Sequence, residues 1–105
     1  MAGMYCLRDL LDLAVRERAE ELLLETGKAP VIHTGGRRHP LDLPVLTNDN
    51  VADLFSSVAT MEQAEELRRC GDIRFIYASD HSGRFAVKAS TEGRDFSLKI
   101  QPLSG

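Results

Sequence analysis

Apolar residues near the start of the chain recur every three or four positions, with charged residues between them. On a helix this spacing gathers the apolar side chains on one face and the charged ones on the other. The pattern predicts an amphipathic helix over residues 7–15, whose buried face would contain Leu7, Leu10, Leu11, Ala14 and Val15.

The next segment, residues 18–27, is compatible with two structures. Its Glu and Leu residues extend a helix well, and Gly27 could cap such a helix. A short apolar run before a turn is equally typical of a buried strand. Helix propensity alone favours a helix here.

Residues 31–41 predict two strands joined by a glycine turn. Short runs at 31–33 and 37–41 flank Gly35 and Gly36, and Pro30 ends any helix that precedes them.

Two helices are predicted in the middle of the chain. Residues 50–59 carry apolar side chains at helical spacing, and Thr47 or Asn48 would cap this helix. Thr60 and Gln63 have the spacing of a capping box, and Gly71 can end the helix that it opens.

The last third of the chain alternates between apolar and polar residues, as strands do. Three such segments, around residues 73–78, 84–90 and 95–101, predict a meander. Its inward positions have ordinary core character and include Phe85, Val87, Leu98 and Ile100. With no repeat and no internal linker, the chain is predicted to be one α+β domain over residues 1–105, of which we expect residues 1–5 to be disordered.

Composition argues against several classes of function. The formal net charge of −3, from 13 Lys and Arg against 16 Asp and Glu, gives no reason to expect binding to nucleic acid or an anionic membrane. No segment approaches the roughly 18 apolar residues of a membrane span, and the N-terminus lacks a secretory pattern. Cys6 and Cys70 are expected to be free thiols in a cytoplasmic protein.

The chain contains none of the common catalytic motifs. A P-loop is excluded because Gly27-Lys28, the only Gly-Lys pair, is followed by Ala29. Hydrolase, zinc-protease and dinucleotide fingerprints are also missing. The His and Cys residues lack the close spacing of metal ligands, so we expect no catalytic residue, no metal and no cofactor.

Arg37, Arg38 and His39 form a small basic cluster that could hold a phosphate or an acidic partner. Three basic residues on a turn are more often only solvated. The first helix and the residues directly after it carry several acidic side chains. Such an acidic surface is likewise more often solvated than a binding site.

Several strings, in this order, resemble the N-terminal domain of the PilT family, the type IV pilus retraction ATPases and related secretion motors. The likeness runs from about Leu7 to Leu103. The strings are Leu7-Arg-Asp-Leu-Leu-Asp-Leu-Ala-Val-Arg, Pro30-Val-Ile-His, Leu43-Pro-Val-Leu-Thr, Gly83-Arg-Phe-Ala-Val and Leu98-Lys-Ile-Gln-Pro.

The resemblance implies a PAS-like fold, with an antiparallel sheet of about five or six strands flanked by about three helices. It implies a strand at residues 20–25, with Leu22 and Leu24 pointing inward together, in place of the helix that propensity favours. In the family a linker to a RecA-like motor domain follows, so residues 102–105 would be the tail where this linker starts.

Three features depart from the family pattern. The family motif Ala-Ser-Asp-Leu-His-Leu has Glu21 and Leu23 here in place of its Asp and His, and Arg18 stands where the family usually has glycine. After Gly83 the family tends to have two arginines and an asparagine that reach toward the subunit interface and nucleotide. This chain has Arg84, Ala86 and Lys88.

The resemblance implies a non-catalytic protein-interaction module that regulates or recruits a pilus or secretion motor ATPase. Arg84 and Lys88 on one strand face, with Arg37 or Arg38, are the candidate contacts. Two alternatives stay open: a PAS-like sensor of a small ligand or nucleotide, and the N-terminal part of a complete twitching-motility ATPase. Self-association through an exposed edge strand is a further expectation.

Overall fold

The computed structural model describes residues 7–79, 83–93 and 95–103. The predicted disorder of residues 1–5 lies outside the described residues, as do Cys6 and His81.

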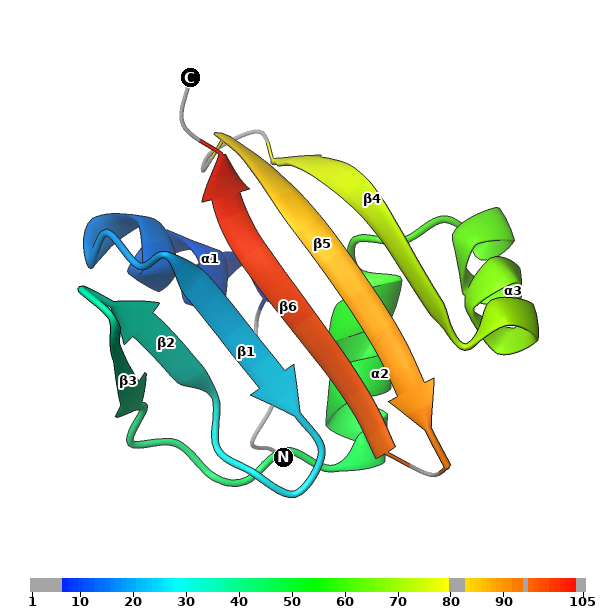
Figure 1. The fold of residues 1–105 in the computed structure, drawn as a ribbon, viewed down its shortest axis with the longest axis horizontal. Helices are drawn as coiled ribbons and strands as arrows, with labels where there is room; N and C mark the ends of the chain where they lie inside the picture. Colours follow the sequence, from blue (N-terminus) through cyan, green and yellow to red (C-terminus); the bar gives the residue numbers. More distant parts are fainter. Residues whose placement is uncertain (1–6, 80–82, 94, 104–105) are drawn as a thin grey trace.

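Three helices and six strands make up the described part of the chain (Figure 1). In order they are α1 (Leu7–Arg16), β1 (Glu21–Glu25), β2 (Val31–Thr34), β3 (Arg37–Pro40), α2 (Asn48–Ser56), α3 (Met61–Cys70), β4 (Asp72–Ser79), β5 (Gly83–Glu92) and β6 (Asp95–Leu103). All the strand pairs are antiparallel, which confirms the predicted α+β fold.

The six strands form one sheet in the order β3-β2-β1-β6-β5-β4. The first three strands are one meander and the last three are another. The two meanders meet in the centre, where Leu22 pairs with Ile100 and Leu24 with Leu98. The strand predicted at residues 95–101 continues through Pro102 and Leu103, which pair with β5.

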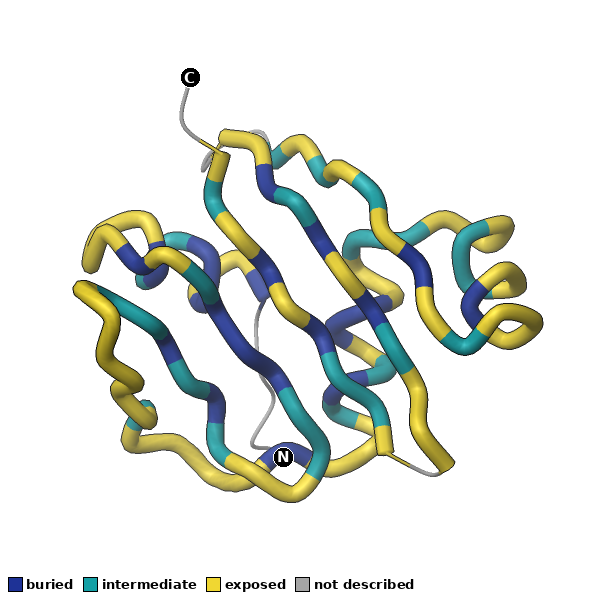
Figure 2. Tube along the Cα trace, in the orientation of Figure 1, coloured by how far each residue is buried: buried dark blue, intermediate teal, exposed yellow. Residues whose placement is uncertain are grey.

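Helices α1 and α2 lie behind the sheet in the view of Figure 1, and α3 lies beside β4. The hydrophobic core fills the space between α1, α2 and the sheet, and its largest fully buried side chains include Phe85, Leu22 and Leu98. Figure 2 shows the buried positions running across the middle of the sheet. The predicted inward residues of β5 and β6 are confirmed as core.

The segment with two possible structures, residues 18–27, contains a strand. Leu22 and Leu24 are both 0% exposed, as the resemblance implies, because they pack into the core between two neighbouring strands. Tertiary context therefore overrides the helical propensity of Glu and Leu. Leu23 alternates to the other sheet face and is also buried, at 4% exposure.

The capping box predicted at Thr60 and Gln63 is present, and α2 begins with a second one, in which Thr47 is the N-cap. The Thr47 hydroxyl accepts a hydrogen bond from the Asn50 N–H at 3.1 Å, and the Asn50 side chain accepts one from the Thr47 N–H at 3.0 Å. Thr60 and Gln63 make the same reciprocal pair at the start of α3. α2 occupies Asn48–Ser56, so it begins and ends earlier than the spacing at 50–59 predicts.

The hairpin of β2 and β3 turns at Gly35 and Gly36, which have φ values of 56° and 78°. Positive φ at both central residues is the requirement of the tight turn that joins two twisted strands. This confirms the predicted glycine turn.

Arg18 also has a positive φ, of 56°, at the end of α1. The Ala19 N–H donates to the Ala14 carbonyl at 2.8 Å and the Arg18 N–H to that of Val15 at 3.1 Å. This is the Schellman pattern, in which the left-handed position is usually glycine. The backbone here explains why glycine is the expected residue at position 18.

We predict that Arg18→Gly raises the free energy of unfolding by about 0.5–1 kcal/mol, because it removes a left-handed penalty of roughly 1–2 kcal/mol at some cost in chain entropy. Urea denaturation measures this. Arg18→Ala keeps the penalty and serves as the control, which should leave stability nearly unchanged. An equal gain in both variants would show that the arginine side chain, not the backbone, causes the difference.

Candidate functional site

The face of the sheet turned away from α1 and α2 carries a row of three cations. Arg74 of β4 pairs with Lys88 of β5, which pairs with Lys99 of β6. Directly opposite residues on neighbouring strands project to the same side, and all three are exposed while their chain neighbours face the core. We call Arg74, Lys88 and Lys99 the cation row.

Among the described residues, no carboxylate forms a salt bridge with the cation row. The salt bridge found among the described residues joins Lys28 to Glu25, and none involves Arg74, Lys88 or Lys99. Like charges directly opposite one another in a sheet repel. The register therefore places three cations side by side on this face.

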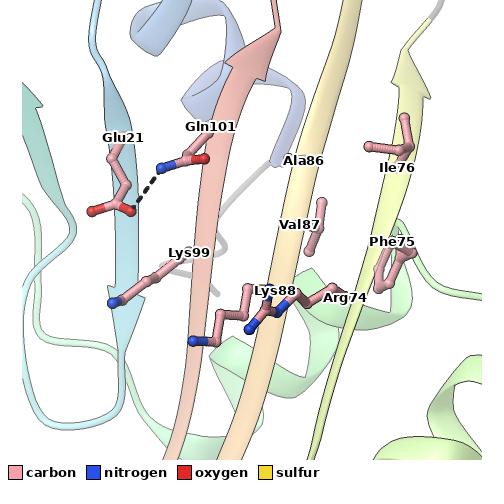
Figure 3. Close-up of a pocket in the computed structure, with 9 residues that line it drawn as sticks. All are labelled: Glu21, Arg74, Phe75, Ile76, Ala86, Val87, Lys88, Lys99 and Gln101. Carbon is pink, nitrogen blue, oxygen red and sulfur yellow. Dashed lines mark hydrogen bonds between the residues drawn. The ribbon is translucent and has the colours of Figure 1, made fainter.

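The cation row borders an open depression of about 620 Å³ on the same face (Figure 3). In Figure 3 the Arg74 side chain extends from β4 across β5 towards Lys88. At the far side of the depression, the Gln101 amide donates a hydrogen bond to the Glu21 carboxylate at 3.3 Å. The depression is lined by Glu21, Arg74, Phe75, Ile76, Ala86, Val87, Lys88, Lys99 and Gln101.

An exposed apolar strip lies next to the cation row on the same face. Ile76 is 55% exposed and pairs with Ala86, while Leu103 is 39% exposed and pairs with Arg84. We call the face that carries the cation row and this strip the open face.

Two of the predicted contact residues lie together on this face. Arg84 and Lys88 project from the same side of β5, and four residues of strand separate them by about 13 Å. Lys88 belongs to the cation row, and Arg84 lies beside the apolar strip.

The structure does not bring Arg37 and Arg38 to the same place. Both lie on the edge strand β3, four strand spacings or roughly 19 Å from β5. Adjacent strand residues project to opposite faces, so these two arginines also point apart. The Arg38 Nε donates a hydrogen bond to His33 Nε2 at 3.1 Å.

Sequence reasoning missed Arg74 and Lys99. Each is a lone cation in an alternating strand, and nothing local marks it. Arg74 and Lys99 align with Lys88 only through the pairing of β4 and β6 with β5. A prediction of the strand register would therefore have been needed to find them.

Among the described residues, no group of three or more His, Cys, Asp or Glu side chains is placed to hold a metal ion. None of the described helices has both the length and the apolar composition needed to cross a bilayer.

Solved structures share this fold. The pilus retraction motor PilT with bound ADP superposes with a TM-score of 0.86 over 92% of this chain, at 18% sequence identity. The ATPase DotB of Legionella pneumophila gives 0.81 over 98% at 20% identity, and DotB of Yersinia pseudotuberculosis gives 0.70 over 99% at 11% identity. The chain has the fold of a domain of the PilT and DotB ATPases.

The fold is thus that of the N-terminal domain to which the sequence strings point. The chain spans 29–32% of the length of these three proteins. No protein-family model matches the sequence. No curated protein matches it either.

Most departures from the PilT pattern fall on the open face. Glu21, Leu23, Ala86 and Lys88 all occupy outward positions of β1 and β5, whereas Leu22, Leu24, Phe85 and Val87 between them face the core. This chain therefore shares the fold of the motor proteins, and the positions where it departs from the resemblance, Leu23 excepted, are not part of its core.

We predict that Lys88→Glu stabilises the protein by about 0.5–1 kcal/mol at low salt, because it turns two repulsive cross-strand pairs into two attractive ones at an exposed site. Urea denaturation measures the difference. In about 1 M sodium chloride, where charges are screened beyond roughly 3 Å, most of the gain should disappear.

Lys88→Gln is the graded control for this prediction. It removes the repulsion without creating attraction, so its stability should lie between those of the other two proteins. A Lys88→Glu protein less stable than the unsubstituted one would contradict the prediction.

Proposed function

We propose that this chain is a non-catalytic, cytoplasmic protein-interaction module that recruits or regulates a pilus or secretion motor ATPase through its open face. The observation that carries the proposal is an uncovered, positively charged sheet face on a domain fold that PilT and DotB motors share.

The surface of the open face supports binding to a protein. A sheet with helices on one side leaves its second face available, and here that face combines cations with the exposed Ile76 and Leu103. Apolar side chains bordered by charges are typical of protein interfaces, where the charges set partner choice and association rate.

The absence of catalytic motifs from the sequence supports a non-catalytic role. The sequence contains no P-loop and no hydrolase or dinucleotide fingerprint. A separate copy of such a domain would compete for, or add to, contacts that a motor makes with its own N-terminal domain. This competition gives a physical route to regulation.

We predict that Arg84→Glu weakens binding to the pilus retraction or secretion ATPase of the same organism by about tenfold or more, because it reverses the charge of an exposed residue on the proposed contact face. Surface plasmon resonance with the full-length motor measures this, with and without ATP.

Arg8→Glu is the matched control. It makes the same change of charge at an exposed position on α1, behind the sheet, and should bind as the unsubstituted chain does. Failure of the unsubstituted chain to bind the motor in any nucleotide state would refute the proposed function. Equal binding by Arg84→Glu would exclude Arg84 as a contact.

A further inference from the structure

We propose that the cation row binds an acidic, amphipathic helix of a partner protein. This inference rests on the proposed function in one respect, that the open face binds a protein, and it adds the chemistry and shape of the partner segment.

The spacing of the cation row fits a helix. Arg74, Lys88 and Lys99 occupy opposite positions on three neighbouring strands, so successive cations start about 5 Å apart. Carboxylates three or four residues apart on a helix have Cβ atoms about 5–6 Å apart. Alternate side chains of an extended segment are nearly 7 Å apart, which matches the cation row less well.

A partner could supply the carboxylates that pair with the cation row, because no described residue of this domain does so. The acidic side chain lining the depression, Glu21, accepts a hydrogen bond from Gln101 and lies on β1, beyond Lys99. It forms no salt bridge with the cation row. A carboxylate placed between two neighbouring cations would convert their mutual repulsion into two attractions.

The surroundings of the cation row favour a protein segment over a phosphate group. Phosphate sites in proteins draw on free backbone N–H groups and on arginine forks. β5 and β6 each pair with strands on both sides, which engages their backbone in the sheet, and the row holds one arginine and two lysines. Ile76, near Arg74 on the same strand, is half-exposed. An apolar side chain of a partner can pack against it, whereas a phosphate group cannot.

Together these features specify the partner segment. It presents acidic side chains three or four residues apart, flanked by a leucine-like residue that covers Ile76 and Ala86. A helix laid on a sheet is a common way for two layers to pack, and here it would give the sheet a second covered face.

The test uses a synthetic helical peptide of about 18 residues, long enough to hold a helix, with Glu at i, i+4 and i+7 and Leu beside them. Nuclear magnetic resonance titration of the isotope-labelled chain should show saturable shifts at Arg74, Lys88 and Lys99. Lys88→Glu should weaken binding by about tenfold or more, and Arg8→Glu should leave it unchanged.

Two further probes keep the inference falsifiable. A peptide of the same composition, with its glutamates at alternate positions and a central proline, should bind at least severalfold more weakly. Inorganic tripolyphosphate should fail to displace the helical peptide at equal concentration. Urea denaturation of Lys88→Glu in the titration buffer separates a loss of binding from a loss of folded protein.

The inference is overturned if the helical peptide does not bind, if Lys88→Glu binds it equally well, if the proline peptide binds as tightly, or if tripolyphosphate displaces it. These outcomes are distinct from a failure of the proposed function. Peptide binding without motor binding would refute the motor as partner and leave the cation row as a site. Motor binding that survives Lys88→Glu would support the motor as partner and refute the cation row as its binding site.

Discussion

The pairing of β1 with β6 is the contact on which the rest of the structure depends. It joins two meanders that are far apart in sequence, and it buries Leu22, Leu24, Leu98 and Ile100 to 1% exposure or less. Neither three-stranded unit alone could cover the apolar faces of α1 and α2. Closing so long a loop costs chain entropy, and burial of these central side chains offsets that cost.

The helices and the core lie on one side of the sheet. Most side chains on the other side are therefore not required to pack in the core. The core positions of β1 and β5 keep apolar residues, while the outward positions between them depart from the PilT pattern. This division is consistent with TM-scores above 0.8 at sequence identities of 18–20%. The fold is specified on one face of each strand, and the other face is free to vary in charge and polarity.

The sequence specified most of the local structure but little of the site. Periodicity and caps were enough for α1, for the Thr60 capping box and for the glycine hairpin, since these depend on residues a few positions apart. β1 needed family resemblance, because its Glu and Leu residues favour a helix until the neighbouring strands are in place. The cation row was beyond sequence reasoning, because cross-strand register is a tertiary property. Arg37 and Arg38, adjacent in sequence, instead fall far from Lys88.

Three aligned cations do not by themselves indicate a binding site. Exposed like charges cost a folded protein only some tenths of a kcal/mol, and water and salt reduce even that, so a solvated basic strip is well tolerated. What distinguishes this strip is its coincidence with a depression and with an isoleucine that remains 55% exposed. A purely solvated face would gain stability from a carboxylate at position 88, between two cations. Local choices that oppose stability and converge on one surface are typical of functional sites.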